Sequence, residues 1–176
     1  SLWVTGLIIR NTPIKALEHF ERALRIAERI KDSTSICNYL LAISSIQKAM
    51  GNIKASDEAI EKGLQASTVL KDPDIRIKLL YNSATTLPSK WQYLQGIEKL
   101  QEVINLSIQS NNKIMLAKAQ SSIATTLNRQ GDPLRALEYY LKGLRIYEEL
   151  NGRRGICGLL LTMGNIKSEQ KEHEAA

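Results

Sequence analysis

The stretch DPLRALEYYLKGLRIYEELNG, residues 132–152, carries the pattern that decides the fold of this chain. Ala136 is followed four residues later by Tyr140 and eight residues later by Leu144, which is the spacing of one face of a helix. The same three positions recur without gaps at intervals of 40 residues, as Ala16, Phe20 and Leu24, then Ser56, Ile60 and Leu64, then Gly96, Leu100 and Ile104. A period between about 20 and 50 residues is typical of proteins built from stacked repeats.

Each period divides into two helical segments. The quoted stretch belongs to the second, helix B, which we predict at about 13–31, 53–71, 93–111 and 133–151. Asp132 before Pro133 is a typical helix start, because the side chain caps the helix and proline fits its first turn. The first segment, helix A, is predicted at about 34–50, 73–87, 113–130 and 153–170. Short turns at Gly51 and Gly131 predict that the two helices lie antiparallel.

Helix A carries its own repeated positions. Two repeat positions are expected in the core. The first is occupied by Leu40, Leu80, Gln120 and Leu160, and the second by Ile43, Ser83, Ile123 and Met163. A small residue always follows, namely Ser44, Ala84, Ala124 and Gly164. A small residue at one fixed place predicts that two helices approach closely there.

This combination resembles the tetratricopeptide repeat (TPR), which has a small residue in helix A and Ala-x3-aromatic followed by another small residue in helix B. In this chain the helix B positions are Ala16, Phe20 and Ala23; Ser56, Ile60 and Gly63; Gly96, Leu100 and Val103; and Ala136, Tyr140 and Gly143. The period of 40 exceeds the usual 34 residues. The resemblance implies an all-α, right-handed α-solenoid of antiparallel helix hairpins, a TPR-like superhelix. Similar long repeats occur in bacterial transcriptional activators, sensor kinases and cyclases, and in eukaryotic cell-polarity scaffolds.

The repeat register covers nearly the whole chain. We therefore expect residues 1–176 to form a single TPR-like array of about four repeats. Residues 1–10 fall in the second half of a helix A and residues 171–176 open a further helix B, so we expect a fragment of a longer chain.

Composition narrows the class of protein. The net charge of +6 is spread along the chain, and only Arg153 and Arg154 are adjacent basic residues, so no nucleic-acid tail is indicated. The longest apolar run is five residues, at 39–43, which is far too short for a membrane span. Cys37 and Cys157 occupy the same position in repeats that are not neighbours, so we expect two reduced, buried thiols and a cytoplasmic protein. The alternative is a reactive or metal-binding cysteine.

Residues with catalytic or ligand chemistry are sparse. His19 and His173 are the only histidines, and we interpret His19 as a surface or partly packed side chain. The spacing patterns of zinc sites and of phosphate-binding loops are absent from the sequence. We therefore expect no enzyme activity, no cofactor and no metal.

The better candidate for function is the surface of the A helices. In TPR proteins helix A lines the concave groove, and transferring those positions residue by residue predicts a peptide-binding groove. Its residues are Asn38, Leu41, Ser45, Lys48, Lys78, Tyr81, Asn82, Thr85, Lys118, Ser121, Ser122, Thr125, Asn128, Arg129, Leu161, Thr162 and Asn165. Amides can pair with a peptide backbone and cations with carboxylates, which favours a partner of acidic character. The alternative is that these are ordinary solvated helix positions.

Some TPR domains hold a C-terminal carboxylate with Lys and Asn from successive A helices. Asn82 and Lys118 match half of such a clamp, while Leu41, Ser45 and Ser122 do not match the rest.

One segment, residues 86–91, replaces the Gly turn of the other repeats. Pro88 is predicted to end its helix early, since the residue before proline leaves the helical region. Trp91 either fills the gap left by the shortened helix or forms a contact site.

These observations together predict a protein- or peptide-binding scaffold or regulatory module without catalysis, and without direct nucleic-acid or membrane contacts. One alternative is the ligand- or peptide-sensing region of a bacterial transcriptional regulator or signalling protein. A second alternative is a self-association module that uses apolar faces at uncapped ends.

Overall fold

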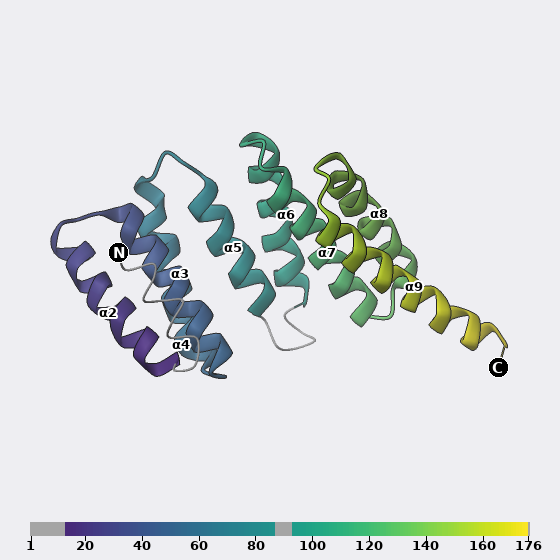
Figure 1. Cartoon of the computed structure of the whole chain (residues 1–176), viewed down its shortest axis with the longest axis horizontal. Helices are drawn as coiled ribbons and strands as arrows, with labels where there is room; N and C mark the ends of the chain where they lie inside the picture. The colour runs from purple at the N-terminus through teal and green to yellow at the C-terminus, as the bar shows by residue number, and fades with distance from the viewer. Residues whose placement is uncertain (1–12, 87–92, 176) are drawn as a thin grey trace. The chain divides into compact units, whose positions relative to one another are not determined.

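We describe residues 13–86 and 93–175 of a computed structural model, with side chains to residue 168 (Figure 1). The described residues form α-helices joined by short turns, together with one 3-10 turn. The chain divides into two compact units, Ser1–Thr86 and Leu87–Ala176. Each unit is described by itself.

The first unit consists of two antiparallel hairpins. It contains α2 (Pro13–Arg29), α3 (Ser33–Ala49), α4 (Ile53–Ala66) and α5 (Asp74–Thr86), with the 3-10 turn η1 (Ser67–Val69) between the last two helices. Each helix packs on the next one along the chain, and α3 also contacts α5. The α-helix found at the predicted helix B of residues 53–71 is shorter than predicted. It ends at Ala66, is followed by the 3-10 turn η1, and Leu70 is extended.

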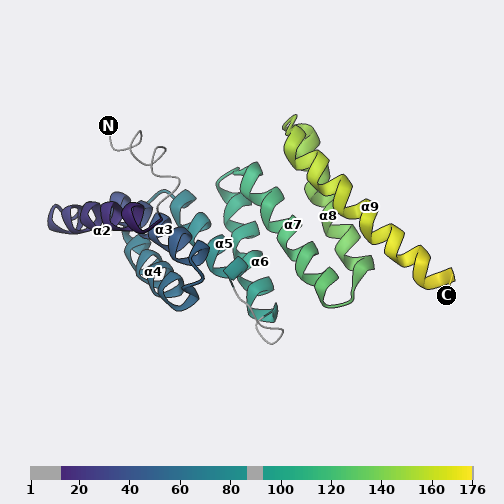
Figure 2. The ribbon, with the colours of Figure 1, turned by 60° about the horizontal axis from the view of Figure 1, so that its bottom comes forward.

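The second unit repeats this order. It contains α6 (Tyr93–Gln109), α7 (Lys113–Arg129), α8 (Pro133–Glu149) and α9 (Arg153–Ala175), and each again packs on the next (Figure 2). The predicted boundaries agree with these bounds to within a few residues at most helix ends. The segment with Pro88 and Trp91 lies outside the described residues.

Left-handed residues end the helices at a regular interval. Lys31, Gly51, Asn111, Gly131 and Asn151 have φ between 52° and 83°. In each case the next amide donates to the carbonyl five residues back, as in Asp32 N to Ala27 O at 3.0 Å and Asp132 N to Leu127 O at 3.0 Å. This is the Schellman arrangement, which satisfies carbonyls at a helix end and reverses the chain.

Three helices begin with a side-chain cap. Asp32, Asn112 and Asp132 accept hydrogen bonds from the backbone amides of Ser35, Met115 and Arg135. Asn52 occupies the same place before α4 but makes no cap hydrogen bond. The caps thus confirm the predicted helix start at Asp132.

The core of each unit lies between its A and B helices. In the first unit, Leu40, Ile43 and Ala59 form one buried cluster with Leu17, Phe20, Leu24 and Ile36 around it. In the second unit, Tyr140 is 2% exposed, and Ala124 and Ala136 are fully buried. The predicted small residues Ser44, Ala84 and Ala124 are all buried. At Ser44 the close helix approach is seen directly, because its hydroxyl oxygen is 2.9 Å from that of Ser56 on α4.

The last repeat departs from the prediction. Leu160, which the repeat places in the core, is 53% exposed, and Cys157, which the repeat predicts to be buried, is exposed. A Cβ atom added to Gly164 would meet nothing within 4 Å, so no helix approaches closely there. The physical reason is that helices α4 and α8 cover these positions in α3 and α7, whereas no described helix follows α9.

The cap at Asp132 provides a test of the helix starts. We expect Asp132→Ala to lower the free energy of unfolding by about 1 kcal/mol, because an amide of the first turn of α8 loses its acceptor. Thermal or urea unfolding monitored by circular dichroism measures the change. Asn52→Ala is the control and should have a clearly smaller effect, since Asn52 caps no backbone amide and loses only an exposed hydrogen bond that its side chain donates to Gln47. Equal losses in the two variants would contradict this account.

The two free thiols should differ in reactivity. Burial raises the pKa of the Cys37 thiol, so its reactive thiolate forms only at a pH above the ordinary range, while Cys157 lies exposed on α9. We expect an alkylating reagent at pH 8 to modify Cys157 quickly, and Cys37 only after unfolding, as peptide mass spectrometry would show. Equal labelling rates in the folded protein would argue against the burial of Cys37.

Candidate peptide-binding surface

The predicted groove residues fall on two sides of the A helices. Because residues three and four apart share one face of a helix, the seventeen positions separate into two stripes. The open stripe comprises Asn38, Ser45, Lys78, Asn82, Thr85, Lys118, Ser122, Thr125, Arg129, Thr162 and Asn165. The packing stripe comprises Leu41, Lys48, Tyr81, Ser121, Asn128 and Leu161. In α3 and α7 the packing stripe lies between the open stripe and buried positions such as Cys37 and Ala124.

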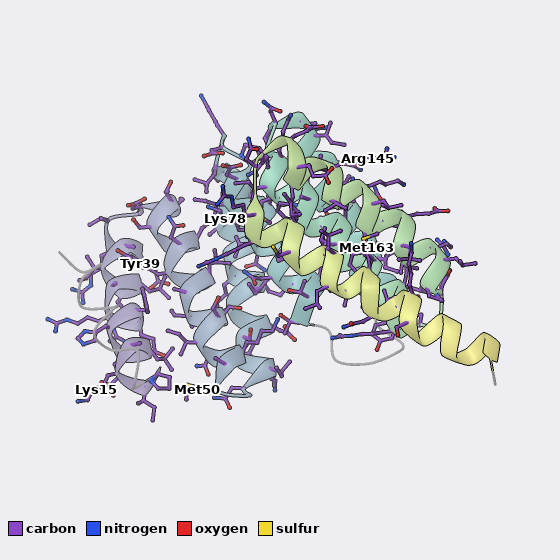
Figure 3. All side chains as sticks on the ribbon, turned by 45° about the vertical axis from the view of Figure 1, so that its right-hand side comes forward. Lys15, Tyr39, Met50, Lys78, Arg145 and Met163 are labelled. Atoms are coloured by element: carbon purple, nitrogen blue, oxygen red, sulfur yellow. The ribbon has the colours of Figure 1, made fainter. Side chains whose placement is uncertain are left out.

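In the first unit the open stripe runs along α3 and α5. Asn38, Ser45, Lys78 and Thr85 are exposed, and Asn82 is half-buried (Figure 3 labels Lys78). The Ser45 hydroxyl donates to a carbonyl one turn earlier in its own helix at 2.9 Å, and the Thr85 hydroxyl does the same at 3.0 Å. These hydroxyls are therefore satisfied locally, and the amide and ammonium groups carry the capacity for a partner.

In the second unit the open stripe runs along α7 and α9. Lys118, Arg129 and Asn165 are exposed, while Ser122 and Thr162 are half-buried. Thr125, also half-buried, lies at the edge of the stripe, because its hydroxyl is 2.9 Å from the phenol oxygen of Tyr140 on α8. Thr125 thus contributes to helix packing as well as to the surface.

The charges of the open stripe are all positive. Lys78, Lys118 and Arg129 are exposed, and none of them forms a salt bridge with another described residue. Among the residues whose side chains are described, the stripe contains no carboxylate. Each unit therefore presents cations and amides together, a combination that pairs with carboxylates and with peptide groups.

The packing stripe serves the fold. Ser121 lies against Gly143 of α8. A Cβ atom added to Gly143 would lie 3.0 Å from the hydroxyl oxygen of Ser121. Leu41 packs on the buried cluster that contains Cys37 and Ile60. Tyr81 and Asn128 are half-buried, whereas Leu161 is 68% exposed. Sequence reasoning grouped these residues with the open stripe because both stripes lie on the same half of the helix.

Lys48 joins two A helices. Its ammonium nitrogen donates to the carbonyl oxygen of Thr85 and to the hydroxyl of Thr86, each at 3.2 Å. It therefore binds the last turn of α5, where the free carbonyls of a helix attract a cation. Burial lowers the pKa of Lys48, and the nearby Asp57 carboxylate opposes that shift. Lys48 is thus occupied within the first unit.

The open stripe also contains small residues, which the sequence pattern did not indicate as binding residues. Among the described side chains, Ala42 and Ala49 on α3 and Gly158 on α9 occupy its remaining positions. A Cβ added to Gly158 would meet nothing within 4 Å, so this part of the surface is open.

A separate basic cluster was missed by sequence reasoning. Arg22, Arg25 and Arg29 surround Ile26 on α2 and line a shallow hollow with it. All four side chains are exposed, and Ile26 is 54% exposed. The spacing of three, four and seven residues places them on one helix face, which was visible in the sequence.

Other groups that could act in catalysis or metal binding are few in the described part of the chain. His19 is exposed on α2, in agreement with the surface interpretation. Among the described residues, His, Cys, Asp and Glu side chains form no group of three that could hold a metal ion. None of the described helices is both long and apolar enough to cross a membrane. Trp91, the proposed contact site, lies outside the described residues.

Comparison with known proteins supports the repeat assignment. Residues 116–155 match the family described as tetratricopeptide repeat, which confirms the resemblance over one full period. Those residues include most of α7, all of α8 and the first residues of α9. No curated protein sequence matches the chain.

Solved structures share the fold at low sequence identity. The apo form of RapI is similar with a TM-score of 0.83 and 15% identity, over 98% of this chain and 64% of that one. A Rap protein complexed with Competence and Sporulation Factor is similar with a TM-score of 0.79 and 16% identity, over 98% and 49%. BtubC from P. vanneervenii is similar with a TM-score of 0.77 and 13% identity, over 91% and 67%.

The predicted fold class is thereby confirmed as all-α, with TPR-like antiparallel helix hairpins. The chain spans about two thirds or less of the length of these solved relatives.

Mutation can distinguish Lys48, which is hydrogen-bonded to α5, from Lys78, which is exposed on the open stripe. We expect Lys48→Ala to lower the free energy of unfolding of the first unit by about 1 kcal/mol, because two hydrogen bonds between α3 and α5 are lost. Lys78→Ala is the matched control and should leave the stability unchanged, since Lys78 is exposed on α5. Chemical unfolding curves of both variants test this. A stable Lys48→Ala variant would show that the bridge contributes nothing.

Proposed function

We propose that this chain is a protein- or peptide-binding scaffold or regulatory module, with no catalysis of its own, and that residues 1–176 act as one TPR-like array. The open stripe is its binding surface, and the partner is an extended or helical peptide with acidic character. The observation that carries the proposal is the set of exposed cations, Lys78, Lys118 and Arg129, on A helices whose stripe has no described carboxylate.

The exposed cations of the open stripe are available to pair with carboxylates of a partner. An exposed ammonium or guanidinium group without a salt bridge is solvated, and a partner carboxylate can bind it without breaking an internal contact. The amides of Asn38 and Asn165 can both donate to and accept from a peptide backbone. The packing stripe is unsuited to this role wherever a helix B covers it, because its groups already contact that helix.

A regulatory setting is the second candidate function. The similarity to a Rap protein complexed with Competence and Sporulation Factor supports a sensing region in a bacterial transcriptional regulator or signalling protein. In that case the bound ligand or peptide changes the arrangement of the helices. Hydrogen exchange of the A helices with and without the captured partner tests it, and unchanged protection would favour a passive scaffold.

Charge reversal tests the binding surface. We expect the triple variant Lys78→Glu, Lys118→Glu and Arg129→Glu to lose at least tenfold in affinity for partners captured from the source cell, because the carboxylate contacts become repulsive. Calorimetry with each identified partner measures the affinity.

The matched control reverses three exposed cations outside the stripe, Lys54, Lys62 and Arg145. Both triple variants remove six units of charge, two for each reversal, and so share a net charge of zero, from +6. If the two variants lose affinity equally, the effect is one of net charge, and the open stripe is not the binding surface.

A further inference from the structure

Helix α2 carries a row of arginines on the side that faces away from the core of the first unit. Arg22, Arg25 and Arg29 are spaced by three, four and seven residues, which places them on one face over two turns of helix. The opposite face of α2 contains Phe20 and Leu24, which pack against the buried cluster of α3 and α4. The three arginine side chains are exposed, and we call them the arginine face.

The positions of the arginine face are exposed in every helix B, whatever precedes it. Helices α4 and α8 each pack against an A helix on both sides along the chain, and their equivalent residues are exposed as well. These residues are Lys62, Gln65 and Val69 on α4, and Lys142, Arg145 and Glu149 on α8. A helix A before α2 would therefore leave the three arginines uncovered. Ile26 lines the hollow with them, but its equivalents Ala66 and Ile146 are half-buried, so the arginines define the site.

Positive charge is concentrated at the arginine face. The same three positions sum to +3 on α2, +1 on α4 through Lys62, and −1 on α6 through Glu102. On α8 they sum to +1, because Lys142 and Arg145 are partly offset by Glu149. None of the three arginines forms a salt bridge with another described residue. Three neighbouring cations without an ion pair attract an anion from outside the described part of the chain.

Carboxylates border the arginine face and limit the size of the anion that fits it. Over its whole length α2 has four cations and three carboxylates, Glu18, Glu21 and Glu28, so its net charge is only +1. A long polyanion such as nucleic acid, or an anionic membrane surface, would meet these carboxylates as well as the arginines. A compact anion over Arg25 would meet chiefly the three guanidinium groups, which line one hollow. The arrangement therefore favours a small group of high charge.

A phosphoryl group has the charge and the acceptor atoms for this site. It carries a charge of about −1.5 to −2 at neutral pH and three strong acceptor oxygens, whereas a carboxylate carries a single charge. Guanidinium groups bind phosphate oxygens through pairs of parallel hydrogen bonds. Arg22 and Arg29 are about 10 Å apart along the helix axis, with Arg25 between them, and all three border the same hollow. One phosphate can therefore pair with more than one arginine.

We propose that the arginine face of α2 binds a phosphorylated serine or threonine of a partner protein. The phosphate lies over Arg25, and Arg22 and Arg29 flank it. The hollow is shallow, which suits a side chain on an exposed segment of a protein better than a small molecule that must be enclosed. This function is additional to peptide binding at the open stripe, which lies on the A helices.

The test uses immobilised degenerate peptide libraries whose fixed central residue is phosphoserine, serine or glutamate. We expect the unmodified chain to bind the phosphoserine library with an apparent Kd at least tenfold lower than for the other two, because only phosphate brings nearly two charges. Arg22→Gln, Arg25→Gln and Arg29→Gln together should raise this Kd at least tenfold. Glutamine is a good helix former and the sites are exposed, so the melting temperature should change little.

The matched control is the triple variant Lys62→Gln, Lys142→Gln and Arg145→Gln. These cations occupy equivalent positions on α4 and α8, and both triple variants lower the net charge from +6 to +3. The control should bind the phosphoserine library as the unmodified chain does. The charge-reversed variant of the open stripe should also still bind it, so failure of the proposed function at that surface remains distinguishable from failure here.

Several results would overturn the proposal. They are equal binding of the phosphoserine library and either other library, equal losses in the two glutamine variants, and loss of binding in the open-stripe variant with none in the α2 variant. Duplex DNA and vesicles containing phosphatidylserine are the alternative probes. If one of them binds through the arginine face while the phosphoserine library does not, the face belongs to nucleic acid or membrane contact instead.

Discussion

The close approach of helix B to the preceding helix A is the constraint on which both units depend. It is made where small residues meet, as at the Ser44 and Ser56 hydroxyls, 2.9 Å apart, and at Gly143 against Ser121. A larger side chain at these points would separate the helices and expose the core behind them. Tyr140 and Ile60 are buried at 2% and 1% exposure because the neighbouring small residues let their helices come close.

The same constraint separates binding from packing on the A helices. Once helix B covers one side of helix A, the adjacent stripe is the part left for a partner. The exposed Lys78 and Lys118 lie there, whereas Ser121 and Leu41 are used for packing. Lys48 shows that charge alone is a poor guide, since its ammonium is held by the last turn of α5.

Much of the fold was predictable because its causes are local. The turns at Gly51 and Gly131 need a left-handed backbone, the Asp132 cap needs a carboxylate, and the core positions follow helical spacing. The candidate site was less predictable. Leu41 and Ser121 differ from Asn38 and Lys118 by a rotation of less than a quarter turn, and only contacts with the next helix distinguish the two sets.

The sequence by itself determined the helices, their turns and the pairing of small with large residues, because each depends on neighbours within a few positions. Only the tertiary structure decided the fate of identical side chains at different places. Cys37 and Leu40 are buried under α4, while Cys157 and Leu160 are exposed on α9. The physical reason is that burial depends on which helix lies opposite: α4 lies opposite Cys37 and Leu40, and none of the described helices lies opposite Cys157 and Leu160.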